Sequence, residues 1–339
     1  MAGSRGYRSY RGKGSKKKMV LAVILLLVIL AALAVSLLQK YIVYDGSGSR
    51  QLEVPWQKEE QQEPEEPVEL DLVIQPVEEM EEPLRGIALP VGPLSAASWD
   101  TVRSGQAQWN GAAITLKDSA GTVYYDFASA PHNPAAVAED TAAALTEWLA
   151  GEMDTIARIS CFRDPRAANA DVEGLGLKNT GGYIFYDGSN SQWLDPAKPA
   201  ARQYLCEIAK EAAELGFHEI LLTDVSYPTE GKVDKIAYGE GIRQEHLQGF
   251  LREMRAALEP CGVRLSVELP ADVILTGGND LAGLDLTGIA PLADRIYARI
   301  LPTEAEACEA AVTAACADTE FVPILTAAEA EAFEQFLIQ

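Results

Sequence analysis

Two acidic side chains lie at the ends of neighbouring apolar runs. Asp224 follows the run Glu219–Thr223, and Pro228 comes soon after it and cannot continue a β-sheet. Glu268 lies near the end of the next run, Arg264–Leu269. In α/β barrels the carboxyl ends of the strands hold the reacting groups. Two carboxylates that face one substrate can cleave a glycosidic bond, one as acid and the other as nucleophile or base.

Each carboxylate also has a structural interpretation. A strand-end aspartate often caps the following helix or turn, and Glu268 could pair with Arg264 or Arg299 at the mouth of a barrel. A tryptophan such as Trp193 can stack on a sugar ring or belong to the core. Further candidates for substrate binding lie after or near the predicted strands: Asp118, Arg163, Asp164, Trp193, Tyr227 and Arg299.

Other kinds of site are disfavoured. The three histidines, His132, His218 and His246, lack a recognisable serine or cysteine partner and have no zinc-ligand spacing. The five cysteines form no disulfide-scaffold pattern, so we expect buried thiols, with one disulfide as the alternative. We therefore expect a site without a metal or a cofactor.

Short apolar runs alternate with amphipathic segments from residue 84 onward, and this alternation predicts a parallel sheet. The clearest helix is Arg243–Leu258, whose apolar residues recur at helical spacing before Pro260 and Gly262. No G-x-G-x-x-G follows the first strand, so a (β/α)8 TIM-barrel-like fold is favoured over a dinucleotide-binding fold. Seven strands are predicted: Arg85–Leu89, Ala112–Leu116, Ile156–Cys161, Glu219–Thr223, Arg264–Leu269, Arg295–Ile300 and Phe321–Leu325.

The number of strands leaves the closure of the barrel open. Phe336–Ile338 is too short to predict an eighth strand. Either the barrel is incomplete, or a segment with the character of a loop, such as Thr122–Phe127, supplies the missing strand.

The N-terminal part of the chain has a different character. Residues 1–18 hold seven basic side chains and no acid, and residues 19–38 carry no charge. Twenty such residues form a helix of about 30 Å, which matches the hydrocarbon core of a bilayer. We expect a single-pass transmembrane helix with a cytoplasmic basic tail and an extracellular C-terminal domain. The alternative is a cleaved signal peptide with its cleavage site near Ala32-Leu33-Ala34, which also exports the rest.

Residues 39–83 are rich in glutamate, glutamine and proline, and we expect an extended acidic linker that precedes a domain at residues 84–339. The chain carries a net charge of −22 in spite of its basic tail. A folded part this acidic repels phosphate backbones, so nucleic acid is not an expected partner.

Several segments resemble a known family. I-A-R-I-S-C-F-R-D-P at 156–165, W-L-D-P at 193–196 and the segment 204–228 are similar to the putative glycoside hydrolase domain family of membrane-anchored or secreted bacterial proteins. The similarity extends to 84–89, 114–121 and 243–269. The resemblance implies an amylase-like TIM barrel and a carbohydrate substrate. It places Asp224 at the family's strand-four aspartate, the presumed nucleophile, and Glu268 at an acidic position after strand five.

The chain departs from the family's pattern beside Asp224. The family has F-D-Y-V-R-F-P, whereas this chain has the shorter T-D-V-S-Y-P and lacks the arginine, a residue type that orients a carboxylate. Thr115 also stands where the family has an aspartate. Two functions follow. One is a glycoside hydrolase of cell-wall or extracellular polysaccharide that uses Asp224 as nucleophile and Glu268 as acid/base. The other is a catalytically degenerate barrel that binds a glycan or a protein at the cell surface.

Overall fold

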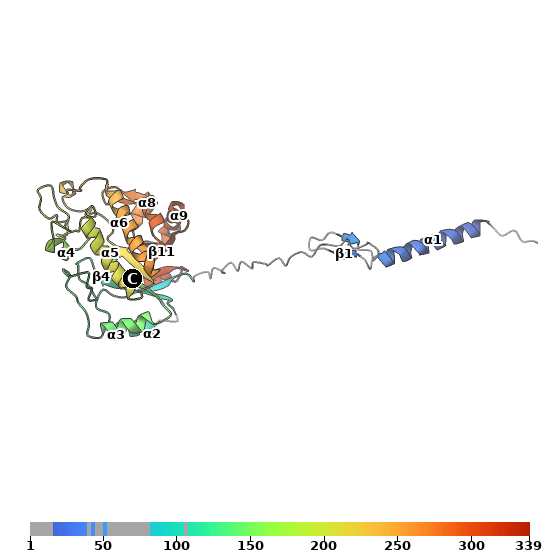
Figure 1. The fold of residues 1–339 in the computed structure, drawn as a ribbon, viewed down its shortest axis with the longest axis horizontal. Coiled ribbons are helices and arrows are strands. Elements are labelled where there is room, and N and C mark those ends of the chain that lie inside the picture. The colour runs from blue at the N-terminus through green and yellow to red at the C-terminus, as the bar shows by residue number, and fades with distance from the viewer. Residues whose placement is uncertain (1–15, 39–41, 45–49, 53–81, 105–107) are drawn as a thin grey trace, which may run out of the picture. The chain divides into compact units, whose positions relative to one another are not determined.

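The computed structural model describes residues 16–38, 42–44, 50–52, 82–104 and 108–339 (Figure 1). The chain divides into two compact units, Met1–Glu79 and Met80–Gln339. In the first unit, helix α1 (Lys16–Leu38) precedes two short antiparallel strands, β1 (Ile42–Tyr44) and β2 (Arg50–Leu52). Most of the predicted tail and of the linker at 39–83 lies outside the described residues.

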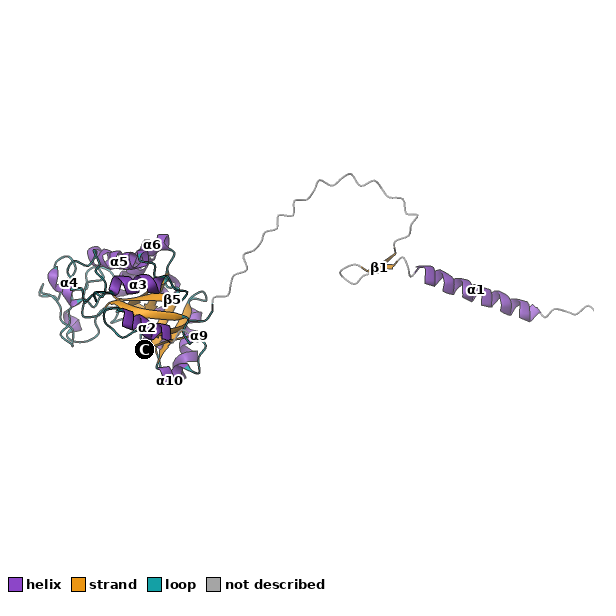
Figure 2. Ribbon diagram, turned by 90° about the horizontal axis from the view of Figure 1, so that it is seen from below, coloured by secondary structure: helices purple, strands orange, loops and turns teal. Residues whose placement is uncertain are grey.

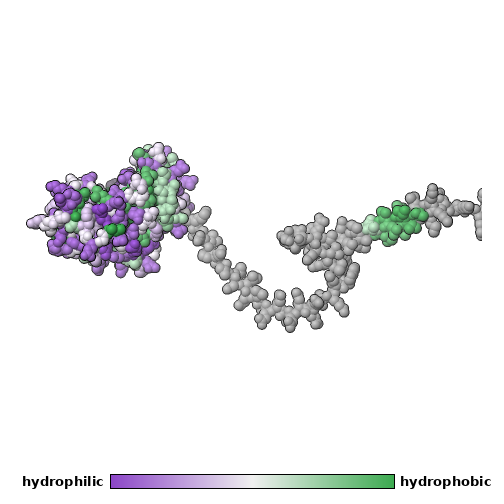
Figure 3. Space-filling model, turned by 90° about the horizontal axis from the view of Figure 1, so that it is seen from above, coloured by the Kyte–Doolittle hydropathy of each residue, from purple (hydrophilic) through white to green (hydrophobic). Residues whose placement is uncertain are grey.

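Helix α1 contains the stretch that we expected to cross a membrane. It is 23 residues long, and its coloured residues are hydrophobic in Figure 3. Within the described part of the chain, no helix combines the length and the apolar character that a membrane span requires. The membrane helix at residues 19–38 is therefore not supported by the structure and stays a prediction.

The second unit is a closed barrel of eight strands, and every neighbouring pair is parallel. Figure 2 shows these strands inside a surround of helices. Around the barrel they are β3 (Arg85–Ala88), β4 (Gly111–Lys117), β5 (Asp154–Ser160), β6 (Glu219–Thr223), β7 (Arg264–Glu268), β10 (Arg295–Arg299), β11 (Glu320–Leu325) and β12 (Phe336–Ile338).

Closure of the barrel settles the question that the strand count left open: the barrel is complete, and its eighth strand is neither missing nor supplied by Thr122–Phe127. The eighth strand is Phe336–Ile338, which pairs with β11 on one side and β3 on the other. Thr122–Phe127 lies in bends and loops, with two isolated bridges at Val123, to Lys117 and to Ala135. A strand of three residues is too short to show the period-two alternation by which strands are recognised in a sequence.

Helices follow most strands, as the alternation of segments predicted. The long helix α6 (Arg243–Leu258) has the predicted bounds and buries its apolar stripe. Proline at the first helical position begins α5 (Pro199–Glu214). The others are α2 (Ala96–Ser104), α3 (Thr141–Leu149), α4 (Pro165–Ala170), α7 (Ala271–Thr276), α8 (Leu286–Ile289), α9 (Ala305–Ala315) and α10 (Ala327–Ala330), and a small hairpin joins β8 (Gly278–Asn279) to β9 (Leu284–Asp285).

Side chains alternate between the inside and the outside of the barrel along each strand. Outward residues such as Ile220 and Leu222 belong to a large core with the helices. Inward residues form a separate small cluster: Leu84, Ala113, Ile156, Leu221, Tyr297, Val322, Ile324 and Leu337. On β5 this alternation continues from Ile156 to Arg158 and Ser160, so those two polar side chains face the inside near the carboxyl end.

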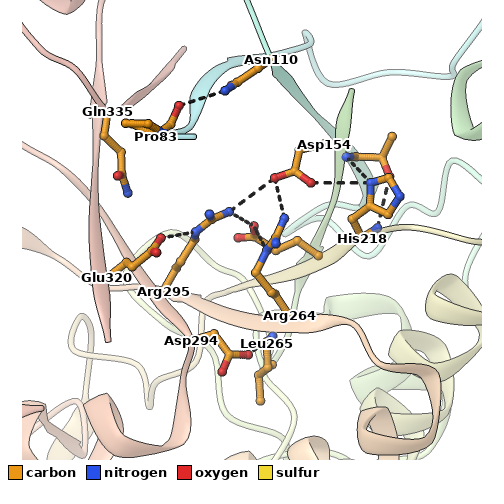
Figure 4. A network of polar contacts seen from close by, with 12 residues as sticks. Pro83, Asn110, Asp154, His218, Arg264, Leu265, Asp294, Arg295, Glu320 and Gln335 are labelled. Carbon is orange, nitrogen blue, oxygen red and sulfur yellow. Dashed lines mark hydrogen bonds and ion pairs between the residues drawn. The ribbon is translucent and has the colours of Figure 1, made fainter. Parts of the chain in front are cut away.

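Charged residues fill the amino-terminal end of the barrel (Figure 4). The Arg295 Nη1 atom lies 2.7 Å from Glu219 Oε2, and these side chains are 3% and 0% exposed. Asp154 lies between Arg295, Arg264 and His218, as Figure 4 shows. Because this end lies opposite the carboxyl ends of the strands, the network is suited to stabilise the barrel rather than to bind a substrate.

Candidate active site

A cavity of about 590 Å³ lies at the carboxyl ends of the barrel strands. Its volume is in the range of small-molecule binding sites, about 300–1,000 Å³. The structure brings four predicted site residues into its wall: Asp118, Asp224, Glu268 and Arg299. The wall also contains Lys117, Arg158 and Ser160, which we did not single out as site residues from the sequence.

Asp224 is held in an unusual backbone conformation. Its φ of 52° lies in the left-handed region, which few residues other than glycine occupy. The Ser160 hydroxyl donates a 2.6 Å hydrogen bond to Asp224 Oδ2, and the Phe162 N–H donates to its backbone carbonyl at 3.2 Å. Within the described residues, the carboxylate accepts no bond from a helix or turn amide. Such backbone outliers concentrate at functional sites, and this one turns a carboxylate into the cavity wall.

Glu268 is paired with an arginine that we did not anticipate. Arg158 Nη2 lies 2.9 Å from Glu268 Oε2, and the two side chains are 11% and 22% exposed. The partners considered from the sequence lie elsewhere. Arg264 begins β7 at the opposite end of the barrel, and Arg299 donates to Gln339 Oε1 at 2.6 Å. The Arg158 guanidinium therefore sets the orientation of Glu268.

Asp164 is buried and does not line the cavity. It forms an ion pair with Lys117 at 3.0 Å, in which both side chains are 0% exposed. The Tyr204 hydroxyl and the Asn133 amide also donate to it, at 2.9 and 3.1 Å. Burial alone would raise the pKa of Asp164, but the Lys117 ammonium, the backbone N–H of Ala167 and the Asn133 amide hold the pKa below its ordinary value. Lys117 Nζ also donates to the Ser160 carbonyl at 2.7 Å, which connects this buried pair to Asp224.

A second hollow of about 210 Å³ adjoins the first and shares Asp224, Ser226 and Thr229 with it. Three further predicted residues lie in its wall: Arg163, Trp193 and Tyr227. Trp193 is only 7% exposed, and its indole N–H donates to Asp187 Oδ2 at 2.9 Å. Trp193 is therefore mainly a core residue that offers an edge to this hollow.

The hydroxyl of Tyr227 is used inside the protein. His246 Nε2 lies 2.7 Å from the Glu240 carbonyl, which can only accept, so the proton of a neutral ring is on Nε2. His246 Nδ1 then accepts from the Tyr227 hydroxyl at 2.7 Å. Burial raises the pKa of Tyr227, which keeps it a donor. Tyr227 thus shapes the hollow and presents no hydroxyl to it.

Asp118 has a structural task as well as a place in the wall. Its Oδ1 accepts from the amides of Ala120 and Thr122, at 3.0 and 2.8 Å, and so organises the turn after β4. The Tyr124 hydroxyl donates to Oδ2 at 2.8 Å. Burial and the bond to Asp118 raise the pKa of Tyr124 to about 12.

The family is established by comparison with known proteins. A family model described as "Putative glycosyl hydrolase domain" matches residues 100–319, which is more than half of the chain. The chain belongs to this family. The resemblance found in the sequence is thereby confirmed, and the barrel is that of a glycosyl hydrolase domain. No curated protein matches the sequence significantly.

Solved structures resemble this glycosyl hydrolase domain. A hypothetical protein from Ruminiclostridium thermocellum is 28% identical, with a TM-score of 0.44, and the match covers 51% of this chain and 91% of that one. The PgaB (BpsB) glycoside hydrolase domain from Bordetella bronchiseptica is 12% identical, with a TM-score of 0.54 and coverage of 76% and 93%. A β-N-acetylglucosaminidase from Vibrio harveyi, solved with N-acetylglucosamine, is 14% identical, with a TM-score of 0.48 and coverage of 72% and 41%. The PgaB likeness supports the fold alone.

Arg158 is the main site residue of this glycosyl hydrolase domain that we missed in the sequence. The signal was present in the segment I-A-R-I-S, where period-two alternation places Arg158 on the face of Ile156 and Ser160. Among the described residues, no group of three or more potential metal ligands comes together. All five cysteines are free thiols, so the alternative of one disulfide is not realised.

Proposed function

We propose that this domain is a glycoside hydrolase that cleaves a bond within a cell-wall or extracellular polysaccharide. The observation that carries the proposal is the joint position of Asp224 and Glu268 in the wall of one cavity, on adjacent strands at the carboxyl end of a closed barrel. Membership of the glycosyl hydrolase domain family supports the same reaction class.

In the proposed mechanism, Asp224 acts as nucleophile and Glu268 as general acid and base. Neighbouring strands lie about 4.8 Å apart, so carboxylates from β6 and β7 can reach the two sides of one glycosidic bond. The Ser160 hydroxyl holds the Asp224 carboxylate at 2.6 Å, and Arg158 holds Glu268 at 2.9 Å. Groups fixed in this way need little reorganisation when the bond breaks. Asp118 and Arg299 are the proposed contacts to the sugar in the main cavity, and Arg163 is the proposed contact in the adjoining hollow.

The proposal is tested with the full-length protein on a panel of cell-wall and extracellular polysaccharides. Asp224→Asn and Glu268→Gln should each lower kcat by roughly 10²- to 10⁴-fold while the melting temperature changes little. Asp100→Asn and Glu309→Gln, exposed acids on α2 and α9, are matched controls that should keep wild-type turnover. Equal turnover in the wild type and both site variants would exclude the assignment.

A degenerate barrel that binds glycan without cleaving it is the second candidate. It is favoured by the absence of an arginine between Asp224 and Pro228 and by the engagement of Glu268 with Arg158 at 2.9 Å. It predicts saturable glycan binding that survives Asp224→Asn, and no release of reducing ends.

We also propose that residues 19–38 anchor the protein in the cell membrane, with the barrel outside. The uncharged stretch and its basic flank support this location. In fractionated cells, the chain should sediment with membranes and resist alkaline carbonate, and protease added outside should remove the barrel. Recovery of the intact chain in the carbonate supernatant would contradict the anchor.

A further inference from the structure

Two long loops at the mouth of the barrel are joined into one surface. One runs between α4 and α5, and the other follows β6. The Thr180 N–H donates to the Lys235 carbonyl at 2.7 Å, and the Ala237 N–H donates to the Lys178 carbonyl at 2.9 Å. Gly231 approaches the first loop so closely that an added Cβ would lie 2.9 Å from Gly188 N. The protein's own hydrogen bonds therefore hold this surface together.

The joined loops enclose a third hollow, of about 600 Å³. Its wall includes Tyr186, Lys232 and Lys235. Asp187 belongs to the walls of this hollow and of the 210 Å³ hollow, just as Asp224 belongs to the walls of the 210 Å³ hollow and of the main cavity. The three hollows thus follow one another across the mouth of the barrel, with the candidate nucleophile at the junction of the first two.

The third hollow is lined by an exposed aromatic side chain and an exposed ammonium, which are residue types that can contact a sugar. Tyr186 is 47% exposed, whereas its neighbour Phe185 is 3% exposed and anchors the loop in the core. Lys232 is exposed and forms no salt bridge with any residue that the structure describes, in contrast to Lys235, which lies 3.0 Å from Asp234. An exposed aromatic face can contact the C–H groups of a sugar ring, and an ammonium can donate to its hydroxyl or carboxylate oxygens.

We propose that the hollow lined by Tyr186 and Lys232 binds a sugar unit remote from the cleaved bond. The ligand is a glycan chain that continues from the main cavity across the second hollow, so the enzyme cuts within chains rather than at their ends. The cutting mode rests on the proposed hydrolase function, whereas the binding of a long chain does not. A site for one terminal sugar would need only the main cavity.

Binding is measured by calorimetry on the full-length chain and on its Asp224→Asn variant. The probes are uncrosslinked peptidoglycan glycan strands, which carry carboxylates, and chitin oligosaccharides, each compared with its own disaccharide. Tyr186→Ala and Lys232→Ala should each raise the Kd for the long chain roughly tenfold and leave the disaccharide unchanged. Tyr183→Ala is the matched control, because Tyr183 is 76% exposed in the same loop but lines none of the three hollows.

Turnover then separates the two proposals. If the hydrolase proposal holds, the first products from long strands should be internal fragments, and Tyr186→Ala should raise KM for strands only. If the wild type shows no turnover but still binds long chains more tightly than disaccharides, and Tyr186→Ala loses this preference, the hydrolase proposal is rejected and the remote site is retained. Equal loss of affinity for long and short ligands, or binding of neither polymer, would overturn the remote site. Release of terminal sugars first would overturn the internal cutting.

Discussion

The buried pair of Lys117 and Asp164 offers the sharpest test of how the site is supported. Asp164→Asn keeps the size of the side chain but leaves the Lys117 ammonium without a counter-charge at 0% exposure. Removal of one partner from a buried pair costs about 3–5 kcal/mol. For a domain of this size, 1 kcal/mol corresponds to about 2–4 °C in Tm. The melting temperature should therefore fall by roughly 6–20 °C.

The chain contains a matched control for this prediction. Lys235 and Asp234 also lie 3.0 Å apart, but their side chains are 62% and 70% exposed. Because solvent screens an exposed pair, Asp234→Asn should leave Tm within the scatter of repeated measurements. Lys117→Met combined with Asp164→Asn should recover part of the loss, since neither charge then stays buried alone.

The pH dependence of the same variant gives a second readout. The pKa of Asp164 is lowered in the folded state, so its contribution is fully present above its unfolded pKa of about 3.9 and is lost as the pH falls through the folded value. The difference in Tm between wild type and Asp164→Asn should stay constant from neutral pH to about pH 4 and narrow below it. Differential scanning calorimetry across this range measures it. A difference no larger than that of Asp234→Asn, or one that persists undiminished in strong acid, would refute the reasoning.

Two further variants separate the two ends of the barrel. Arg158→Ala should lower kcat by roughly 10- to 100-fold with a small change in KM, because Glu268 loses the group that orients it. Arg158→Lys should restore part of the rate. Steady-state kinetics that show no loss of kcat in Arg158→Ala would contradict this role. Glu219→Gln should destabilise the fold by about 3–5 kcal/mol, because Arg295 then keeps only its other partners, and its turnover at a permissive temperature should match the wild type. A loss of turnover in folded Glu219→Gln would show that the amino-terminal network acts on the site.

The strands with an apolar run of about five residues were predictable from the sequence, and the last strand was not. β6 and α6 have the predicted bounds because each has a full apolar pattern and a clear stop signal. β12 has three residues, and its place depends on hydrogen bonds to β11 and β3 that no local pattern encodes. Closure of a barrel is a long-range property, so it became visible only in the structure.

Site residues at the end of a strand were predictable from the sequence. The contacts that those residues make with other strands and loops were less predictable. Asp224 and Glu268 follow the rule for carboxyl ends and do share a cavity. Asp164 follows the same rule but is buried against Lys117, Tyr204 and Asn133. Its burial depends on partners from β4, from the loop after β4 and from α5, and the residues around Asp164 in the sequence do not reveal them.

Arg158 supplies a cation to the carboxylate pair although the family's arginine after Asp224 is missing. The sequence suggested that a carboxylate site without that arginine had lost its cation. In the structure, the inward face of β5 brings a guanidinium to 2.9 Å from Glu268, and the Ser160 hydroxyl on the same face holds Asp224 at 2.6 Å. One strand thus orients both carboxylates through side chains two residues apart. A deletion in the loop after β6 therefore does not remove the support for the pair, because that support comes from β5.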